Sequence, residues 1–163
     1  MSVSLLLDTN VWVDNYCADH VASRDARNLI AYAYGNGIKL LYAVGCIKDV
    51  FYVLGHEFKR MARQAGDTLN NGNAEAIQRV VWGCVDNMCQ IATAVGADEA
   101  DVWLARKYKA LTGDLEDNMV LAAARRSSAD YLVTSDQELL RRSSVAALSP
   151  SDMLTLLKTQ TLS

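Results

Sequence analysis

The sequence predicts an α/β fold, a three-layer α/β/α arrangement around a central, mostly parallel sheet. Short apolar runs of strand length alternate along the chain with segments whose apolar residues recur at helical spacing. Such alternation is typical of a parallel sheet that helices cover on both faces. The chain has 163 residues, 51% of them hydrophobic, which is enough for one buried core and too few for two. We therefore expect a single domain over residues 1–163.

The amino-terminal elements follow from apolar runs and from a glycine-rich stop. Ser4 to Leu7 has the character of a strand buried on both faces, and it ends at Asp8. After the aromatic and apolar stretch from Val11 to Tyr16, helical spacing predicts a helix from Ala22 to Tyr34, which Gly-Asn-Gly ends. A second buried strand is predicted from Ile38 to Val44.

The middle of the chain predicts a helical hairpin. One helix is predicted from Val50 to Gln64 and another from Ala74 to Cys89, with the turn-rich stretch from Gly66 to Asn73 between them. We expect these helices to form an insertion at about residues 50–90, beside the sheet. A short strand from Ile91 to Val95 follows.

The carboxyl-terminal part predicts the remaining elements. Asp98 suits the cap of a helix that continues through Tyr108. The next helix, from Asp114 to Arg126, has carboxylates in its first turn and arginines in its last, as the helix dipole favours. The last predicted elements are a strand from Tyr131 to Thr134, a helix from Gln137 to Arg142, an edge strand from Val145 to Leu148 and a helix after Pro150.

Composition narrows the classes of function. The net charge of −3 does not mark a nucleic-acid binder, although bound metal would offset the charge of clustered carboxylates. The cysteines lack the spacing of zinc ligands, so we expect buried, reduced thiols at Cys17, Cys46, Cys84 and Cys89. Because no apolar run approaches the roughly 18 residues of a membrane span, we expect a cytoplasmic protein with no membrane contact.

Acidic side chains give the strongest functional signal. Asp8 and Asp136 each follow a predicted strand, and the carboxyl ends of parallel strands form the edge where active sites lie. Asp114 and Asp117 share one face of a helix, and Asp49 lies near the start of another. Converging carboxylates without basic partners repel one another and usually hold divalent metal ions. The pattern therefore predicts a metal site.

Some of these residues also have ordinary structural interpretations. Asp114 suits a helix cap, and Asp49 taken alone suits a solvated helix surface. Small polar groups beside Asp8 and Asp136 could orient a carboxylate or a metal-bound water, or simply form turns; they are Asn10, Thr134 and Ser135.

An aromatic pair follows the first acidic motif. Trp12 and Tyr16 are four residues apart. They could stack on a nucleobase, but apolar aromatic residues at helical spacing more often belong to a core or a protein interface, which is the interpretation that we favour.

Four motifs are spread over nearly the whole chain. Leu5 to Val11, LLLDTNV, resembles the opening of PIN-domain ribonucleases, and Asp114 to Ala124, DLEDNMVLAAA, resembles the acidic helix of that family. Ala129 to Asp136, ADYLVTSD, resembles its acidic strand end, and Leu148 to Leu154, LSPSDML, is similar to its closing segment. The resemblance is weakest from Met61 to Ile91.

This resemblance implies a magnesium- or manganese-dependent enzyme that hydrolyses RNA phosphodiester bonds. It implies that Asp8, Asp117 and Asp136 bind metal and act in catalysis, with Asp114 as an accessory ligand. The family's second acidic position is usually Glu, where this chain offers Asp49, which is shorter by one methylene. Metals held by carboxylates activate water and neutralise the phosphate, so no nucleophilic side chain is required.

The expected partners are RNA and a protein. Basic side chains around the cleft would contact phosphates without reading sequence; the candidates are Arg60, Arg106 and Arg125. Resemblance to the toxin members of the family implies the toxin component of a toxin–antitoxin pair, with an antitoxin as partner and a homodimer as a further assembly. A free-standing RNA-processing nuclease is the alternative role.

Other classes of function are weaker alternatives. Asp8 after an apolar strand, with Gly113-Asp114 later, also resembles haloacid dehalogenase-type phosphatases, but their acid–base aspartate is replaced by Asn10. A binding module with a weakened metal site is a further alternative, because Asp49 replaces the usual Glu. RNA cleavage that chelator abolishes would distinguish the nuclease from both.

Overall fold

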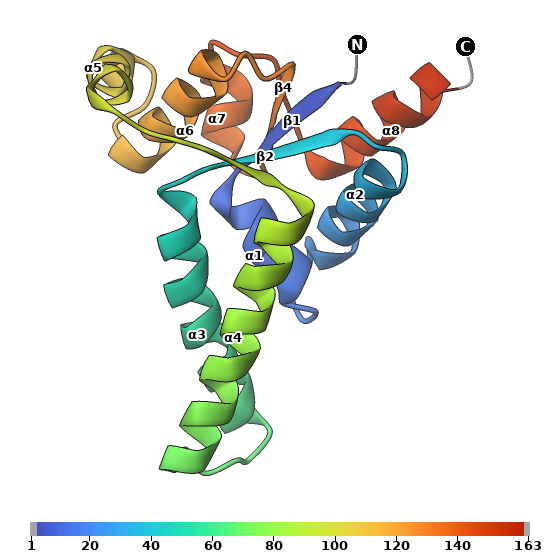
Figure 1. The fold of residues 1–163 in the computed structure, drawn as a ribbon, viewed down its shortest axis with the longest axis vertical. Coiled ribbons are helices and arrows are strands. Elements are labelled where there is room, and N and C mark those ends of the chain that lie inside the picture. The colour runs from blue at the N-terminus through green and yellow to red at the C-terminus, as the bar shows by residue number, and fades with distance from the viewer. Residues whose placement is uncertain (1–2, 162–163) are drawn as a thin grey trace.

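A five-stranded sheet, parallel at every pairing, forms the centre of the computed structural model, which describes residues 3–161 (Figure 1). The predicted α/β class is confirmed. The strand order is β3-β2-β1-β4-β5. The strands are β1 (Ser4–Leu7), β2 (Lys39–Ala43), β3 (Thr93–Val95), β4 (Tyr131–Val133) and β5 (Ala147–Leu148).

Helices cover both faces of the sheet because the buried strands are apolar on both sides. Leu5 and Leu7 of β1 belong to a core shared with α1, α2, α3, α4 and α8, whereas Leu6 belongs to a second core shared with α6 and α7. The helices are α1 (Thr9–Tyr16), α2 (Ser23–Gly35), α3 (Cys46–Gln64), α4 (Asn71–Ile91), α5 (Glu99–Lys107), α6 (Leu115–Arg126), α7 (Gln137–Arg142) and α8 (Pro150–Thr161). The three-layer prediction is thereby confirmed.

The strand order reverses between β1 and β4, and this is where an open parallel sheet forms a crevice. The chain first adds β2 and β3 on one side of β1 and then returns to place β4 and β5 on the other. In the register, Leu7 lies opposite Val133. The residues that directly follow these partners, Asp8 and Thr134, therefore leave the sheet side by side.

Helix α1 was not predicted as a helix. Its sequence, TNVWVDNY, is short and rich in β-branched residues, which disfavour helix. Asp8 initiates the helix because its carboxylate accepts a hydrogen bond from the Thr9 N–H at 2.7 Å. Trp12 is fully buried and Tyr16 is half-buried, so the pair belongs to the core, as favoured from the sequence.

Several strands are shorter than predicted. The apolar residues Ile91 and Ala92 continue and end α4, so β3 begins at Thr93 rather than at Ile91. The edge strand β5 contains only Ala147 and Leu148, where Val145 to Leu148 was predicted. Apolar character alone does not separate the end of a buried helix from the start of a strand.

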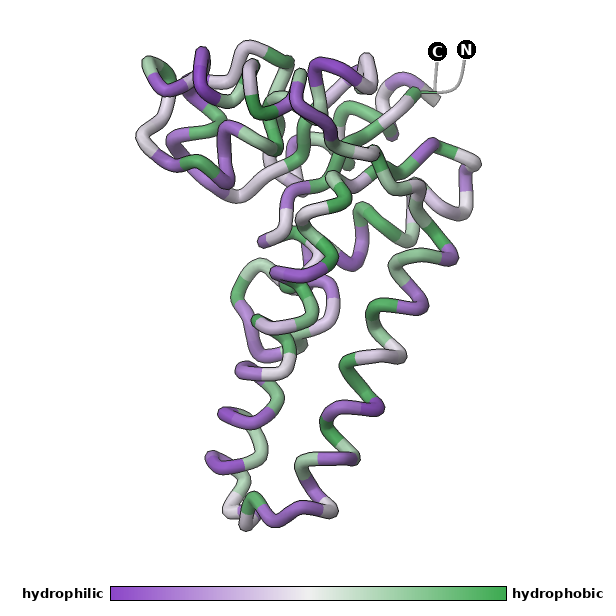
Figure 2. The backbone as a smooth tube through the Cα atoms, turned by 60° about the vertical axis from the view of Figure 1, so that its left-hand side comes forward, coloured by the Kyte–Doolittle hydropathy of each residue, from purple (hydrophilic) through white to green (hydrophobic). Residues whose placement is uncertain are grey.

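Helices α3 and α4 form a hairpin that projects away from the sheet (Figure 1). Hydrophilic residues recur along both helices (Figure 2), and several large apolar side chains are nevertheless exposed; they are Tyr52, Val53, Val80 and Trp82. Phe51 of α3 packs against Trp82 of α4 with ring centroids 5.0 Å apart. Within residues 3–161, no helix is both long and apolar enough to cross a membrane.

The four cysteines are free thiols, as expected, but the prediction that they are buried holds only in part. Cys17 and Cys46 are buried, Cys84 is half-buried and Cys89 is exposed. Cys89 follows Met88, which is fully buried, so the two neighbours on α4 point in different directions. Its sulfur lies 3.4 Å from the Tyr42 hydroxyl.

A salt bridge joins α5 to the end of α6. Asp101 and Asp98 form a capping box at the start of α5, and Arg126 pairs with both carboxylates. Asp101 is only 1% exposed, so loss of Arg126 would leave a buried charge unpaired. We expect Arg126→Gln to lower the free energy of unfolding clearly, because the buried Asp101 carboxylate loses its basic partner; urea denaturation measures the change. Arg125→Gln, at the exposed neighbouring position, should change it by less than about 0.5 kcal/mol.

Candidate functional site

Asp8 lies at the carboxyl end of β1 and is almost completely buried, with 6% of its surface exposed. One carboxylate oxygen caps α1, and the other accepts a hydrogen bond from the Thr134 hydroxyl at 2.7 Å. Burial raises the pKa of Asp8 to about 6, and the charges of Glu116 and Asp136 add to the rise, while the hydrogen bonds oppose it. The side chain is thus held rigidly in a negative environment.

Asp136 follows β4 and is linked to Asp8 through Thr134. The Thr134 hydroxyl, which donates to Asp8, also accepts a hydrogen bond from the Asp136 N–H at 3.0 Å. The Asp136 carboxylate caps α7 by accepting from the N–H groups of residues 138 and 139. Asn10 accepts from the Ser135 N–H at 3.4 Å. The polar residues noted from the sequence therefore contact one another across the β1–β4 edge.

Asp114 and Asp117 lie at the start of α6. Asp114 is the N-cap, as its structural interpretation requires, because its Oδ1 accepts from the N–H groups of Glu116 and Asp117. Burial raises the pKa of Asp117 to about 6, with further contributions from the charges of Asp114, Asp136 and Asp8. These contributions arise because the carboxylates, far apart in the sequence, lie near one another in the fold.

One cavity of about 320 Å³ joins these residues. It is lined by Asp8, Thr9, Asn10, Val13, Asp14, His20, Val53, Asp114, Glu116, Asp117 and Asp136. No lysine or arginine of the described chain lines it, and His20 is its one basic group. Uncompensated carboxylates of this density favour a hard divalent cation with oxygen ligands.

Sequence reasoning missed Glu116 in this cavity. Its carboxylate accepts a hydrogen bond from the Thr9 hydroxyl at 3.4 Å, and burial together with the charge of Asp49 raises its pKa. The signal was present, because Glu116 lies between Asp114 and Asp117 in the first turn of α6. Asp14 was missed for a different reason: it lies on α1, four residues after Asn10, and α1 was not predicted as a helix.

Asp49 lies in the first turn of α3 and does not line the acidic cavity. It lines a neighbouring cavity of about 640 Å³, of which Asp114 and Glu116 also form part. The Lys48 amino group is 3.9 Å from its carboxylate. Asp49 therefore lies beside the acidic cavity rather than in it, and Glu116 lines both cavities.

The basic residues expected to contact RNA lie outside the acidic cavity. Arg60 is engaged by carboxylates, with hydrogen bonds to Asp19 and Glu57, each at 2.7 Å. Arg106 is an exposed residue of α5, and Arg125 is an exposed residue in the last turn of α6. Asp117 lies in the first turn of α6, so Arg125 is at the opposite end of that helix.

His20 forms one wall of the acidic cavity and bridges two elements. Its Nδ1 lies 2.8 Å from an Asp14 oxygen on α1, and its Nε2 lies 3.3 Å from a Glu57 oxygen on α3. The hydrogen bond with Asp14 is the main reason that the pKa of His20 is raised, and Glu57 acts in the same direction. A network of alternating charges thus holds α1 against α3 beside the carboxylates.

We expect His20 to stay protonated above its ordinary pKa of about 6.5. The imidazolium stabilises the folded state fully below that value, and this contribution is lost as pH rises through the raised pKa. An NMR titration of the imidazole protons should show the raised pKa, and Asp14→Asn should lower it. An unchanged midpoint in Asp14→Asn would show that Asp14 does not hold the imidazolium.

The carboxylates converge without forming a finished coordination shell. Within residues 3–161, no group of three or more acidic, histidine or cysteine side chains is already arranged to hold a metal ion. Oxygens of Asp8, Asp114 and Asp136 instead accept hydrogen bonds from hydroxyl and backbone N–H groups. The residue types nevertheless fit a divalent cation, because carboxylate oxygens dominate the cavity.

Comparison with known proteins identifies a family and a shared fold. The family model of the PIN domain matches residues 4–138. No curated protein matches the sequence.

Three solved structures have a similar fold despite low sequence identity. VapBC2 from Rickettsia felis, bound to a DNA fragment from its promoter, is 11% identical with a TM-score of 0.63, covering 90% of this chain and 98% of that one. PAE2754 from Pyrobaculum aerophilum is 20% identical with a TM-score of 0.60, covering 98% and 100%. FitAB bound to the IR36 DNA fragment is 13% identical with a TM-score of 0.56, covering 90% and 95%.

Proposed function

The chain belongs to the PIN domain family, and we propose that it is a divalent-metal-dependent ribonuclease that hydrolyses RNA phosphodiester bonds. The supporting observation is the cavity that Asp8, Asp117 and Asp136 line together at the reversal of strand order, without a lysine or arginine among its lining residues. Family membership leaves the phosphatase alternative without support.

The proposed metal ligands are Asp8, Asp117 and Asp136, with Asp114 and Asp49 as accessory residues, and the structure adds Glu116 as a candidate. When bound, Mg²⁺ or Mn²⁺ would activate water and neutralise charge on the phosphate. These are cations that prefer carboxylate oxygens, the donor type that dominates the cavity.

The protein's own groups have distinct tasks in this proposal. Thr134 fixes the Asp8 carboxylate through a 2.7 Å hydrogen bond, so that Asp8 does not have to be ordered when substrate binds. The raised pKa values of Asp8 and Asp117, each about 6, mean that both are mainly ionised at pH 7 and above. His20 is held between Asp14 and Glu57, where it forms one wall of the acidic cavity.

The ribonuclease proposal predicts metal-dependent cleavage. Purified protein with Mg²⁺ or Mn²⁺ should cleave RNA, and excess EDTA should reduce the rate to background, because the carboxylates alone repel the phosphate. The assay should include p-nitrophenyl phosphate, which a nuclease of this type leaves intact. RNA binding without cleavage under every metal condition would instead support a binding module.

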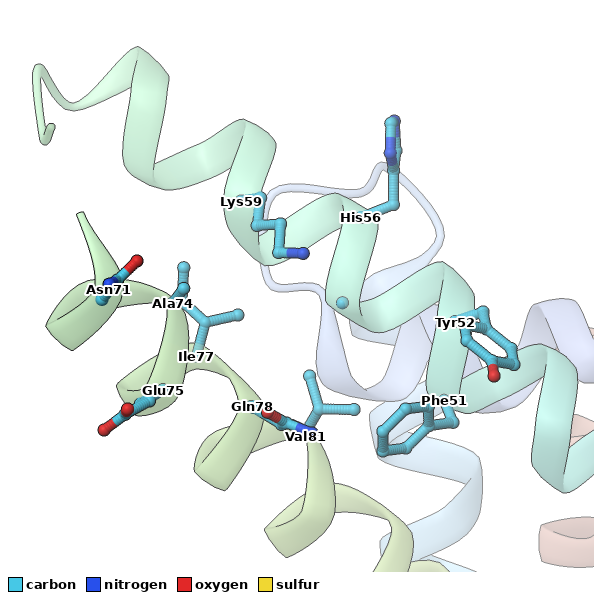
Figure 3. A pocket seen from close by; sticks show the side chains of 11 residues that line it. Phe51, Tyr52, His56, Lys59, Asn71, Ala74, Glu75, Ile77, Gln78 and Val81 are labelled. Atoms are coloured by element: carbon cyan, nitrogen blue, oxygen red, sulfur yellow. The ribbon is translucent and has the colours of Figure 1, made fainter. Parts of the chain in front are cut away.

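We propose further that the protein is the toxin of a toxin–antitoxin pair, with an antitoxin as its partner. Support comes from the fold shared with VapBC2 and FitAB and from the exposed apolar surface of the α3–α4 hairpin, where a cavity of about 500 Å³ lies between the helices. Phe51, Ile77 and Val81 point into this cavity (Figure 3). Expression alone should arrest growth, and co-expression of a small neighbouring protein should relieve it; growth without arrest would favour a free-standing RNA-processing nuclease.

A further inference from the structure

A second cavity adjoins the acidic one and has the opposite charge. It has a volume of about 300 Å³ and lies at the start of α2, lined by Ala18, His20, Val21, Ser23, Arg24, Arg27 and Asn28. His20 lines both cavities, so they are neighbours across one side chain. No acidic residue is among the residues that line this second cavity.

The start of α2 has no side-chain cap. Its N-cap is Ala22, which offers no side-chain acceptor. The Ser23 N–H donates to the His20 carbonyl at 3.0 Å, and Asp25 lies in the first turn. Ser23 is 97% buried, since only 3% of its surface is exposed, and its hydroxyl has no hydrogen-bond partner within the described part of the chain. A buried hydroxyl normally finds a partner, and the positive end of a helix favours an anion. The uncapped positive end of α2 therefore favours an anion.

Two arginines make the cavity cationic. Arg24 is exposed, and neither Arg24 nor Arg27 forms a salt bridge with a carboxylate in residues 3–161. Arg27 donates from Nε to the Asn15 carbonyl at 3.2 Å, which anchors the side chain on α1 while its other N–H groups remain available. Arg60, by contrast, is already neutralised by Asp19 and Glu57.

We propose that Ser23, Arg24, Arg27 and the amino-terminal turn of α2 bind a backbone phosphate of the RNA whose scissile phosphate enters the acidic cavity. This inference rests on the proposed ribonuclease function. Carboxylates repel phosphates, and the proposed metal would offset this only at the scissile phosphate, so an RNA chain needs positive charge directly beside the cleft. Phosphate contacts of this kind position the chain without reading its sequence. None of these residues was a candidate from the sequence.

The first test uses inorganic phosphate and needs no catalysis. In ¹⁵N-labelled, metal-free protein, titration with phosphate should shift the backbone amide signals of residues 23–25 in the native chain and not in the double variant Arg24→Gln/Arg27→Gln. Ser23→Ala, a small change at a buried site, should weaken the response severalfold. The control Lys39→Gln/Arg79→Gln removes the same charge from β2 and α4 and should respond as the native chain does. A native chain without shifts at α2 would overturn the site.

The second test uses RNA cleavage. The double variant Arg24→Gln/Arg27→Gln loses two phosphate contacts. Its KM for an RNA of ten nucleotides should rise about tenfold, while kcat stays within twofold. The slope of log affinity for RNA against log salt concentration should fall in magnitude by about 1.4. KM equal to that of the control variant would overturn the role in RNA binding, even if inorganic phosphate binds. If the native protein fails to cleave any RNA, the proposed function falls, and the anion site is judged by the phosphate titration alone.

Discussion

Asp8→Asn should lower the rate of RNA cleavage by roughly a thousandfold or more. The substitution keeps the shape of the side chain and can retain the cap on α1, but it removes a charged metal ligand at the centre of the cavity. Metal ions contribute several kcal/mol of transition-state stabilisation, and each 1.36 kcal/mol corresponds to about tenfold in rate. The measurement is single-turnover cleavage of a labelled RNA at saturating Mn²⁺.

A matched control separates this loss from a general effect of charge. Asp86 is exposed on α4 and does not line the acidic cavity. Asp86→Asn removes the same charge and should cleave RNA within about twofold of the native rate. Thermal denaturation should show that both variants fold. Native-like cleavage by folded Asp8→Asn would remove Asp8 from the catalytic group.

The second large effect concerns stability, pH and metal. The folded-state pKa of Asp8 is about 6, compared with an ordinary value of 3.8, so ionisation of this group opposes folding. The protonated Asp8 carboxyl stabilises the folded state fully below pH 4, and this contribution is lost as pH rises through about 6. The difference between the two pKa values corresponds to roughly 3 kcal/mol in the free energy of unfolding. Asp117 shifts in the same direction, also to about 6, and adds to the loss.

Bound metal should restore the lost stability, but only where the carboxylates of Asp8 and Asp117 are ionised. A cation at one hundred times its Kd adds about 2.7 kcal/mol to the free energy of unfolding. We expect Mn²⁺ to raise Tm strongly at pH 7.5 and only slightly at pH 5. Asp117→Asn should raise the Tm of the metal-free protein at pH 7.5 and should weaken the response to Mn²⁺. A metal response that does not change between these pH values would contradict the coupling.

Much of this site followed from local sequence, because the carboxyl ends of parallel strands share one edge. From that rule we predicted that Asp8 and Asp136 lie together. The pattern of charges along the helix dipole predicted the start of α6 close to Asp114. Positions that depend on tertiary contacts were not predictable. His20 contacts Glu57 across 37 positions in the sequence, and no local pattern indicates that pairing.

The predicted elements were wrong where residue propensity and tertiary burial favour different structures for the same residues. The valines of α1 suit a strand by propensity, yet the Asp8 cap and burial of Trp12 favour a helix there. The prediction of a buried thiol was wrong at Cys89, because composition does not show which side of α4 faces the core. Arg24 and Arg27 were overlooked because their importance depends on the cavity next to His20 rather than on a cluster in the sequence.

A crystal soaked in Mn²⁺ and measured at the manganese absorption edge shows directly whether distant carboxylates share a cation. The proposal predicts an anomalous peak inside the cavity, about 2.1 Å from carboxylate oxygens of Asp8, Asp117 and Asp136. Glu116 should contact the same ion or a water bound to it. A fully soaked crystal with no peak among these residues, from protein that still cleaves RNA with Mn²⁺, would contradict the assignment.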